Sequence, residues 1–180
     1  MFYHDGMNIG PNQIDTAALI LRLAFGLSIF AHGYNKMFRK NGISGTSKWF
    51  GDVGMRAPVI QARLASITEM SSGIALIIGF ATPLAAAGLV ALMTVAIMVA
   101  HRHNGYFIFR PGQGWEYCAS IIVVALVIAL LGPGRWSVDA ALNFDYSNCT
   151  SITIAIVVGF GSAIAQLVTF WRPKASVTTK

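Results

Sequence analysis

The sequence predicts an all-α transmembrane helical bundle, with a core of four helices and a fifth transmembrane helix at the C-terminal end. The chain has 180 residues, of which 55% are hydrophobic and only 11% are charged, and its mean hydropathy is +0.62. Soluble domains are about a quarter charged, so this composition cannot cover a water-exposed surface. The net charge of +6 is spread mostly over Lys and Arg that flank apolar segments, which is typical of membrane topology. We therefore expect contact with a lipid bilayer and no nucleic-acid partner.

Five apolar segments each have about the ~20 residues that a helix needs to cross a bilayer. They cover approximately residues 16–36, 58–81, 84–101, 116–131 and 152–171. We expect Thr82-Pro83 to separate the second segment from the third, and the breaker at residues 132–134 to end the fourth. A short helix at about residues 46–53 is expected to lie on the membrane surface, because a re-entrant turn would bury Lys48 and Asp52.

Basic residues occur in alternate connections between these segments. The connection from residue 37 to residue 57 is rich in Lys and Arg, whereas the residues before the first segment and the connection at residues 82–83 have none. The positive-inside rule then places the N-terminus outside and the C-terminus in the cytoplasm of a multi-pass protein, which we assign to a prokaryotic cell membrane. Since no basic region precedes the first apolar segment, we expect that segment to be a retained helix.

We expect residues 1–142 to form a four-helix membrane domain, and residues 143–180 to add a loop, the fifth helix and a basic tail. The fifth helix has Ala155, Gly159 and Ala163 at intervals of four residues. Small residues at this spacing let two helices approach closely. The stripe has two alternative roles, which are packing on the other four helices and packing on another protein.

Glu69 is a carboxylate inside the second segment, where an ionisable group costs several kcal/mol unless it is paired or hydrated. At ~1.5 Å per helical residue, it lies ~13 Å from the inner end of that helix. One stripe of the first helix faces inward at helical spacing and consists of Arg22, Gly26, Ile29, Gly33 and Lys36. On the second helix, a polar, small-residue face consists of Ser66, Glu69, Ser72 and Gly73. We expect the first two helices to meet along these faces, with Arg22 or Lys36 compensating Glu69.

Other ionisable residues join Glu69 in the inner half of the bundle. His32 lies at the edge of the first helix's stripe, and His101 and Glu116 lie at the inner ends of the third and fourth helices. The candidates for ligand binding or proton relay are therefore Glu69, His32, Lys36, Arg22, Glu116 and His101. A structural ion pair is the alternative role for Glu69 and Arg22, and hydrogen-bonded packing is the alternative for His32.

The signatures of soluble enzymes do not occur in the chain. It has no Gly-rich phosphate loop, nucleophile elbow, Cys-x-x-Cys or His-Glu-x-x-His motif. His101 and His103 with Glu116 lack the close spacing of a metal site, so we expect no metal. We also expect no intrinsic cofactor. Any redox chemistry would need a quinone or a partner subunit to carry the electrons.

Several short motifs follow one another in order along the first four segments. They occupy residues 21–26, 32–37, 45–50, 69, 72–73, 79–82, 116–117 and 132–139. Over about residues 16–142, this ordered set resembles the DoxX family of membrane proteins. The resemblance implies a four-helix membrane bundle with an association with redox biology, in which some relatives resemble subunits of quinone-reducing thiosulfate oxidation. The fifth helix is an addition to that pattern.

Together, the polar constellation and the resemblance predict a membrane subunit of a redox or respiratory system. Its intramembrane polar pocket would bind a quinone-like ligand or relay protons. Because the chain has no catalytic motif of its own, any enzymatic activity would belong to an oxidoreductase complex. The alternative function is a non-catalytic scaffold that stabilises a larger membrane complex. In either case we expect partner membrane proteins or a homo-oligomer.

Overall fold

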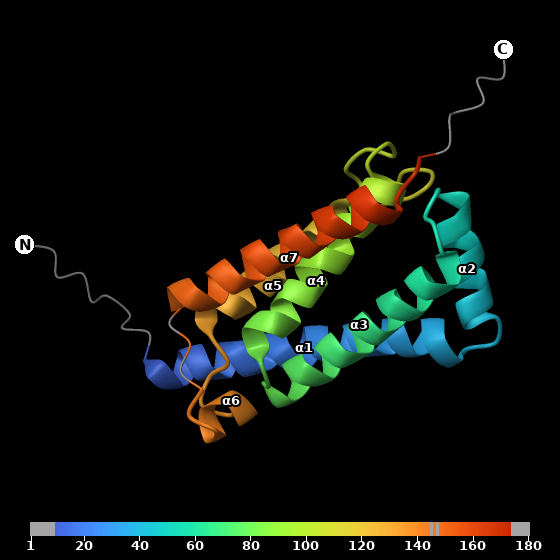
Figure 1. The fold of residues 1–180 in the computed structure, drawn as a ribbon. Helices are drawn as coiled ribbons and strands as arrows, with labels where there is room; N and C mark the ends of the chain where they lie inside the picture. Colours follow the sequence, from blue (N-terminus) through green and yellow to red (C-terminus); the bar gives the residue numbers. More distant parts are fainter. Residues whose placement is uncertain (1–9, 145, 147, 174–180) are drawn as a thin grey trace, which may run out of the picture.

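The computed structural model describes residues 10–144, 146 and 148–173, and the elements in these residues are all helical. Five long helices run between two ends of a bundle (Figure 1). They are α1 (Pro11–Phe38), α3 (Pro58–Ile78), α4 (Thr82–Ala96), α5 (Glu116–Leu131) and α7 (Asn148–Phe170). A π-helical turn, η1 (Ile97–His101), extends α4, and the short helices α2 (Gly42–Asp52) and α6 (Val138–Ala141) lie at opposite ends. The predicted all-α bundle is confirmed.

The turn between α3 and α4 differs from the predicted one. It lies at residues 79–81, where Gly79 and Ala81 have left-handed backbone angles with φ of 67° and 46°. Thr82 and Pro83, which were expected to separate the two helices, instead form the first turn of α4. A proline is tolerated there because the N–H that it lacks would have no acceptor within the helix.

In the part of the chain that the structure describes, three helical stretches are long and apolar enough to cross a membrane. These are Pro11–Phe38, Thr82–His101 and Asn148–Phe170. The fourth predicted segment is the apolar helix α5, which has 16 residues. The remaining one, α3, has 21 residues and carries the charged residues Arg63 and Glu69. The chain is thus a membrane protein with several candidate spans, and spanning by α3 and α5 stays a prediction.

Helix α1 packs along α3 through the predicted faces. Arg22, Gly26, Ile29 and Gly33 are buried residues of α1, as its stripe predicted. The two backbones approach so closely that a Cβ added to Gly73 would lie 2.8 Å from the backbone oxygen of Gly26. Glycine at both positions therefore sets the distance between these helices.

Helix α7 packs on α4 and α5. Its stripe of Ala155, Gly159 and Ala163 is buried, and a Cβ added to Gly159 would lie 2.7 Å from Val90 Cβ on α4. Of the two alternatives for this stripe, the structure shows packing within the chain. The end of α7 also pairs with the α2–α3 connection, since Arg56 N donates to the Phe170 oxygen and Arg172 N donates to the Gly54 oxygen, each at 2.8 Å.

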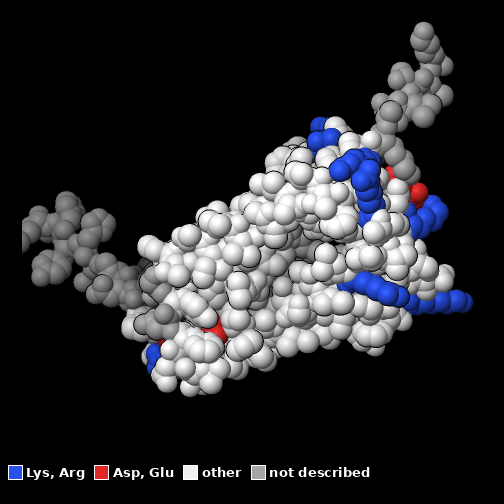
Figure 2. Space-filling view, in the orientation of Figure 1, with Lys and Arg blue, Asp and Glu red and all other residues white. Residues whose placement is uncertain are grey.

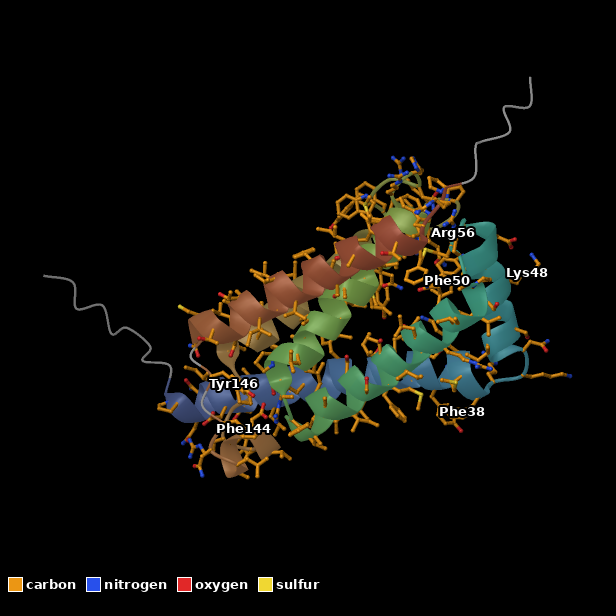
Figure 3. All side chains as sticks on the ribbon, viewed as in Figure 1. Phe38, Lys48, Phe50, Arg56, Phe144 and Tyr146 are labelled. Atoms are coloured by element: carbon orange, nitrogen blue, oxygen red, sulfur yellow. The ribbon has the colours of Figure 1, made fainter. Side chains whose placement is uncertain are left out.

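Lys and Arg side chains gather at the end of the bundle that carries α2, the loop after η1 and the end of α7 (Figure 2). We call this the basic end and the end that carries α6 the opposite end. In Figure 3, Lys48 points away from the bundle, whereas Phe50 of the same helix packs against the apolar cluster beneath α2. The hydrogen bond from Lys48 to Asp52 raises the pKa of Lys48. Helix α2 is thus present where a short helix was predicted and begins a turn earlier than expected, whereas its position on the membrane surface stays a prediction.

Candidate functional site

An ion pair joins Lys36 of α1 to Glu69 of α3 near the basic end. Lys36 Nζ donates to Glu69 Oε1 at 2.5 Å. The Glu69 side chain is 2% exposed and that of Lys36 is 35% exposed. Glu69 Oε2 is buried and has no hydrogen-bond partner in the part of the chain that the structure describes. Of the two cations considered for compensating Glu69, Lys36 is the one that contacts it.

Gly33 brings α1 close enough for this ion pair to form. It lies on the same face of α1 as Lys36, about one turn away. A Cβ added to Gly33 would lie 2.8 Å from both Glu69 Cβ and the Ser66 backbone oxygen. The sequence of α1 thus supplies both the cation and the space that the carboxylate occupies.

The ion pair lines a cavity of about 490 Å³, which we call the first cavity. Its walls come from α1, α2, α3, α4 with η1, the loop before α5, and α5. The polar side chains that line it are those of His32, Lys36, Thr46, Glu69, His101, Gln113 and Tyr117. Most of the remaining wall is apolar, with Trp49, Phe50 and Ile121 among its residues. A cavity of this size with a few polar groups is typical of a site for a small organic ligand.

The contacts of the two histidines determine what they can offer a ligand. His101 Nδ1 lies 2.9 Å from the backbone oxygen of Gln113. Because a carbonyl oxygen only accepts, Nδ1 donates this hydrogen bond, and Nε2 of the neutral ring is an acceptor. The His32 and Tyr117 rings lie with their centroids 6.4 Å apart on α1 and α5. The first cavity therefore presents donors and acceptors from several helices.

Four of the six candidates from the sequence line the first cavity: Glu69, His32, Lys36 and His101. Glu116 does not line it, because Glu116 Oε2 accepts a hydrogen bond from Ile108 N at 3.0 Å and so supports the loop before α5. Arg22 lies at the opposite end of the bundle. Four of the six candidates therefore come together, whereas Glu116 and Arg22 do not join them at the cavity.

The sequence reasoning did not select Tyr117 or Gln113 as site residues. Tyr117, Cys118 and Ile121 line the cavity from one face of α5, at the spacing of a helical turn. That periodicity was visible in the sequence. Gln113 lies in a loop without a periodic pattern, so only the folded chain reveals its contact with His101.

A second group of buried polar residues surrounds Arg22 at the opposite end. Arg22 is 0% exposed, and its Nη2 donates to the Trp136 backbone oxygen at 2.6 Å. Its Nε and Nη1 are buried without a partner among the described residues. Asp139, also 0% exposed, accepts from Ala81 N at 2.7 Å, Thr82 N at 3.0 Å and Thr82 Oγ1 at 2.9 Å. These contacts tie the segment around α6 to α1 and to the α3–α4 turn, which favours the structural role for Arg22.

Metal-binding chemistry has no obvious location in the described ranges. Within them, no three His, Cys, Asp or Glu side chains come together as a metal site. The two cysteines are free thiols, with Cys118 buried on the wall of the first cavity and Cys149 exposed at the start of α7. The candidate site is therefore built from an ion pair, imidazoles and a phenol.

The sequence model of the DoxX family matches residues 17–102 of this chain. Just under half of the chain is thus similar to the DoxX family. DoxX domains are generally associated with membrane proteins of redox systems. The matched DoxX residues run from α1 to the end of η1 and include all four candidates that line the first cavity. No curated protein and no solved structure matches the chain.

The DoxX match is shorter than the resemblance expected from the motifs. It ends at residue 102, so Glu116 and residues 132–139 lie outside it. Helix α5, which supplies Tyr117 and Cys118 to the first cavity, also lies outside the matched DoxX residues. The cavity thus combines helices from the DoxX match with one helix beyond it.

Proposed function

We propose that this protein is a subunit of a membrane redox system and that the first cavity binds the head group of a quinone-like ligand. The observation that carries the proposal is the ion pair between Lys36 and the buried Glu69, which lines the cavity and whose Oε2 has no partner among the described residues. An ionisable group within a membrane helix is costly and commonly marks a ligand or proton pathway.

The lining suits the two redox states of a quinone. The carbonyl oxygens of the oxidised form accept hydrogen bonds, and Lys36 and Tyr117 carry N–H and O–H donors. The hydroxyl groups of the quinol donate, and Glu69 Oε2 and His101 Nε2 are acceptors. Trp49 and Phe50 offer aromatic surface to the ring.

Reduction of the ligand requires electrons and protons from different sources. Each quinone takes up two electrons and two protons and becomes the quinol. In this proposal a partner oxidoreductase supplies the electrons, because the chain itself contains no redox motif. Glu69 and His32 pass protons to the head group from the basic end, where Lys36 donates a hydrogen bond to the carboxylate.

The test is binding of a tail-free quinone, 2,3-dimethoxy-5-methyl-1,4-benzoquinone, to the protein in lipid nanodiscs. Trp49 lines the first cavity, so a bound quinone should quench its fluorescence in a saturable manner, and Trp49→Phe should remove that signal. Glu69→Gln should weaken binding roughly tenfold or more, as expected for a lost hydrogen bond to a charged group.

The matched control is Glu116→Gln, because Glu116 has the same chemistry and lies at the same end but outside the cavity. This variant should bind the quinone as the unchanged protein does. Equal affinity in the Glu69→Gln protein would refute the proposed site.

In the alternative function, a scaffold, Arg22 and Glu69 are structural and the fifth helix is the working surface. The small-residue stripe of α7 packs on α4, so it does not contribute to such a surface. A purely structural ion pair leaves Glu69 Oε2 without a partner among the described residues. The ligand-binding function is therefore the one that the geometry supports best.

A further inference from the structure

We propose that a second cavity, enclosed mainly by α3, α4 and α7, receives the apolar tail of the ligand through a lateral opening to the bilayer. This inference rests on the proposed function for the head group and adds the class of ligand, which is an amphiphile with a membrane-embedded tail. The second cavity has a volume of about 270 Å³.

The two cavities meet at the ion pair. Both are lined by Lys36, Trp49, Phe50, Glu69, Met93 and Ala96. Glu69 therefore lies at the junction, where one oxygen accepts a hydrogen bond from Lys36 and the other has no partner within residues 10–144, 146 and 148–173. A ligand whose head contacts Glu69 in the first cavity can extend its tail into the second.

The lining of the second cavity suits an apolar chain. Beyond the junction it is formed largely by Leu64, Ala65, Ala91, Leu92 and Val95. The hydroxyl of Ser162, which also lines it, donates to the Val158 backbone oxygen of its own helix and so needs no partner from a ligand. Gln166 is likewise engaged, because its Nε2 donates to Gln61 Oε1 at 2.7 Å.

The opening lies between α3 and α7. Helix α3 packs mainly on α1, α2 and α4, whereas α7 packs mainly on α4 and α5. A hydrogen bond between Gln61 of α3 and Gln166 of α7 joins the two helices beside the opening. Figure 2 shows the molecule hollowed between them, towards the basic end. Leu64 of α3, which lines the second cavity, is 48% exposed, so an apolar side chain lies at the opening. Such a surface faces lipid, and the opening therefore leads into hydrocarbon.

The test uses a benzoquinone whose alkyl tail ends in a photoreactive diazirine, bound to the protein in phosphatidylcholine nanodiscs. After illumination and digestion, mass spectrometry should find the label on Leu64, Thr68 or Ser162. Ser162→Phe should lower this labelling to the level of the outward-facing Val157, while binding of the tail-free quinone stays unchanged and shows that the variant is folded.

Two controls make the test specific to the opening. Ala165→Phe adds the same ring to an exposed position of α7 that does not line the cavity, and it should not alter the labelling. Thr68→Phe blocks the cavity from α3, and Ile67→Phe is its matched exposed control. Labelling confined to Val157, Ile164 and Val168, or unaffected by both blocking variants, would overturn the lateral site.

The two proposals fail in different ways. If the tail-free quinone binds but the tail labels only lipid-facing residues, the head site stands and the lateral site is wrong. If the tail-free quinone does not bind but Ser162→Phe and Thr68→Phe still abolish labelling in the second cavity, the proposed function is wrong and the lateral site stands for an apolar chain with another head group.

Discussion

Gly33 of α1 lies directly against Glu69 of α3, where a Cβ on the glycine would come within 2.8 Å of Glu69 Cβ. The position of the Glu69 carboxylate at the junction of the two cavities thus depends on the absence of a side chain at position 33. Any side chain at position 33 must displace either the helix or the carboxylate. The packing of α1 on α3 and the geometry of the candidate site therefore depend on the same residue, Gly33.

Gly33→Ala should lower both stability and quinone binding. Overpacking a tight contact typically costs about 1–3 kcal/mol, and the displaced Glu69 would no longer meet Lys36 at the same distance. Thermal unfolding in detergent and the Trp49 quenching titration measure the two effects. Gly161→Ala is the control, because a Cβ at Gly161 would meet nothing within 4 Å. A similar loss in both variants would show that the contact with Glu69 is not the cause.

Lys36 and Glu69 should behave as a coupled pair in a double-mutant cycle. Lys36→Met removes the hydrogen-bond donor of a buried carboxylate, which should destabilise the protein by about 1–3 kcal/mol. The double variant Lys36→Met with Glu69→Gln should lose less stability than the sum of the two single variants. Chemical unfolding in detergent gives all four free energies. Additive changes would mean that the ion pair contributes no interaction energy.

Asp139→Asn should destabilise the fold without changing the first cavity. Asp139 accepts three hydrogen bonds through two oxygens, and an asparagine has only one acceptor oxygen, so at least one bond to the α3–α4 turn is lost. We expect a loss of roughly 1–3 kcal/mol in unfolding free energy with unchanged quinone quenching. Asp52→Asn in the exposed pair with Lys48 should cost at most about 1 kcal/mol. Weakened quinone binding in Asp139→Asn would contradict this separation of the two ends.

The positive-inside rule predicts that the basic end faces the cytoplasm. Cys149, exposed near the opposite end, should then react with a membrane-impermeant maleimide added to intact cells that express a Cys118→Ser variant. A Ser44→Cys change in α2, made in a background without the native cysteines, should react only after the membrane is permeabilised. The reverse pattern would invert the proposed orientation.

Periodicity predicted the faces of α1, α3 and α7 because one stripe of each helix is small or polar, and the buried residues lie on those stripes. It did not distinguish Lys36 from Arg22 as the partner of Glu69. Both cations lie on the same stripe, and which of them meets Glu69 depends on the axial register of α1 along α3. That register follows from the glycine contacts between the two helices, which the sequence alone does not show.

The segment around α6 was not predictable as a packed element. Its motif at residues 132–139 indicated a breaker, but the roles of Trp136 and Asp139 arise from contacts with α1 and the α3–α4 turn. These partners are distant in the sequence and share no period with it. The same reason explains why Glu116, placed correctly at the basic end, supports a loop and does not line the cavity.

The order of the helices along the chain implies an order in which the two cavities can form during synthesis. The residues that line the first cavity all precede position 122, so its walls are present once α5 has entered the membrane. The second cavity needs Ser162 and Gln166 of α7, which leave the ribosome after the rest of its lining. A nascent chain would therefore contain the first cavity before α7 completes the wall of the second cavity. The backbone hydrogen bonds between Arg56 and Phe170 and between Arg172 and Gly54 would then form after the first cavity is complete.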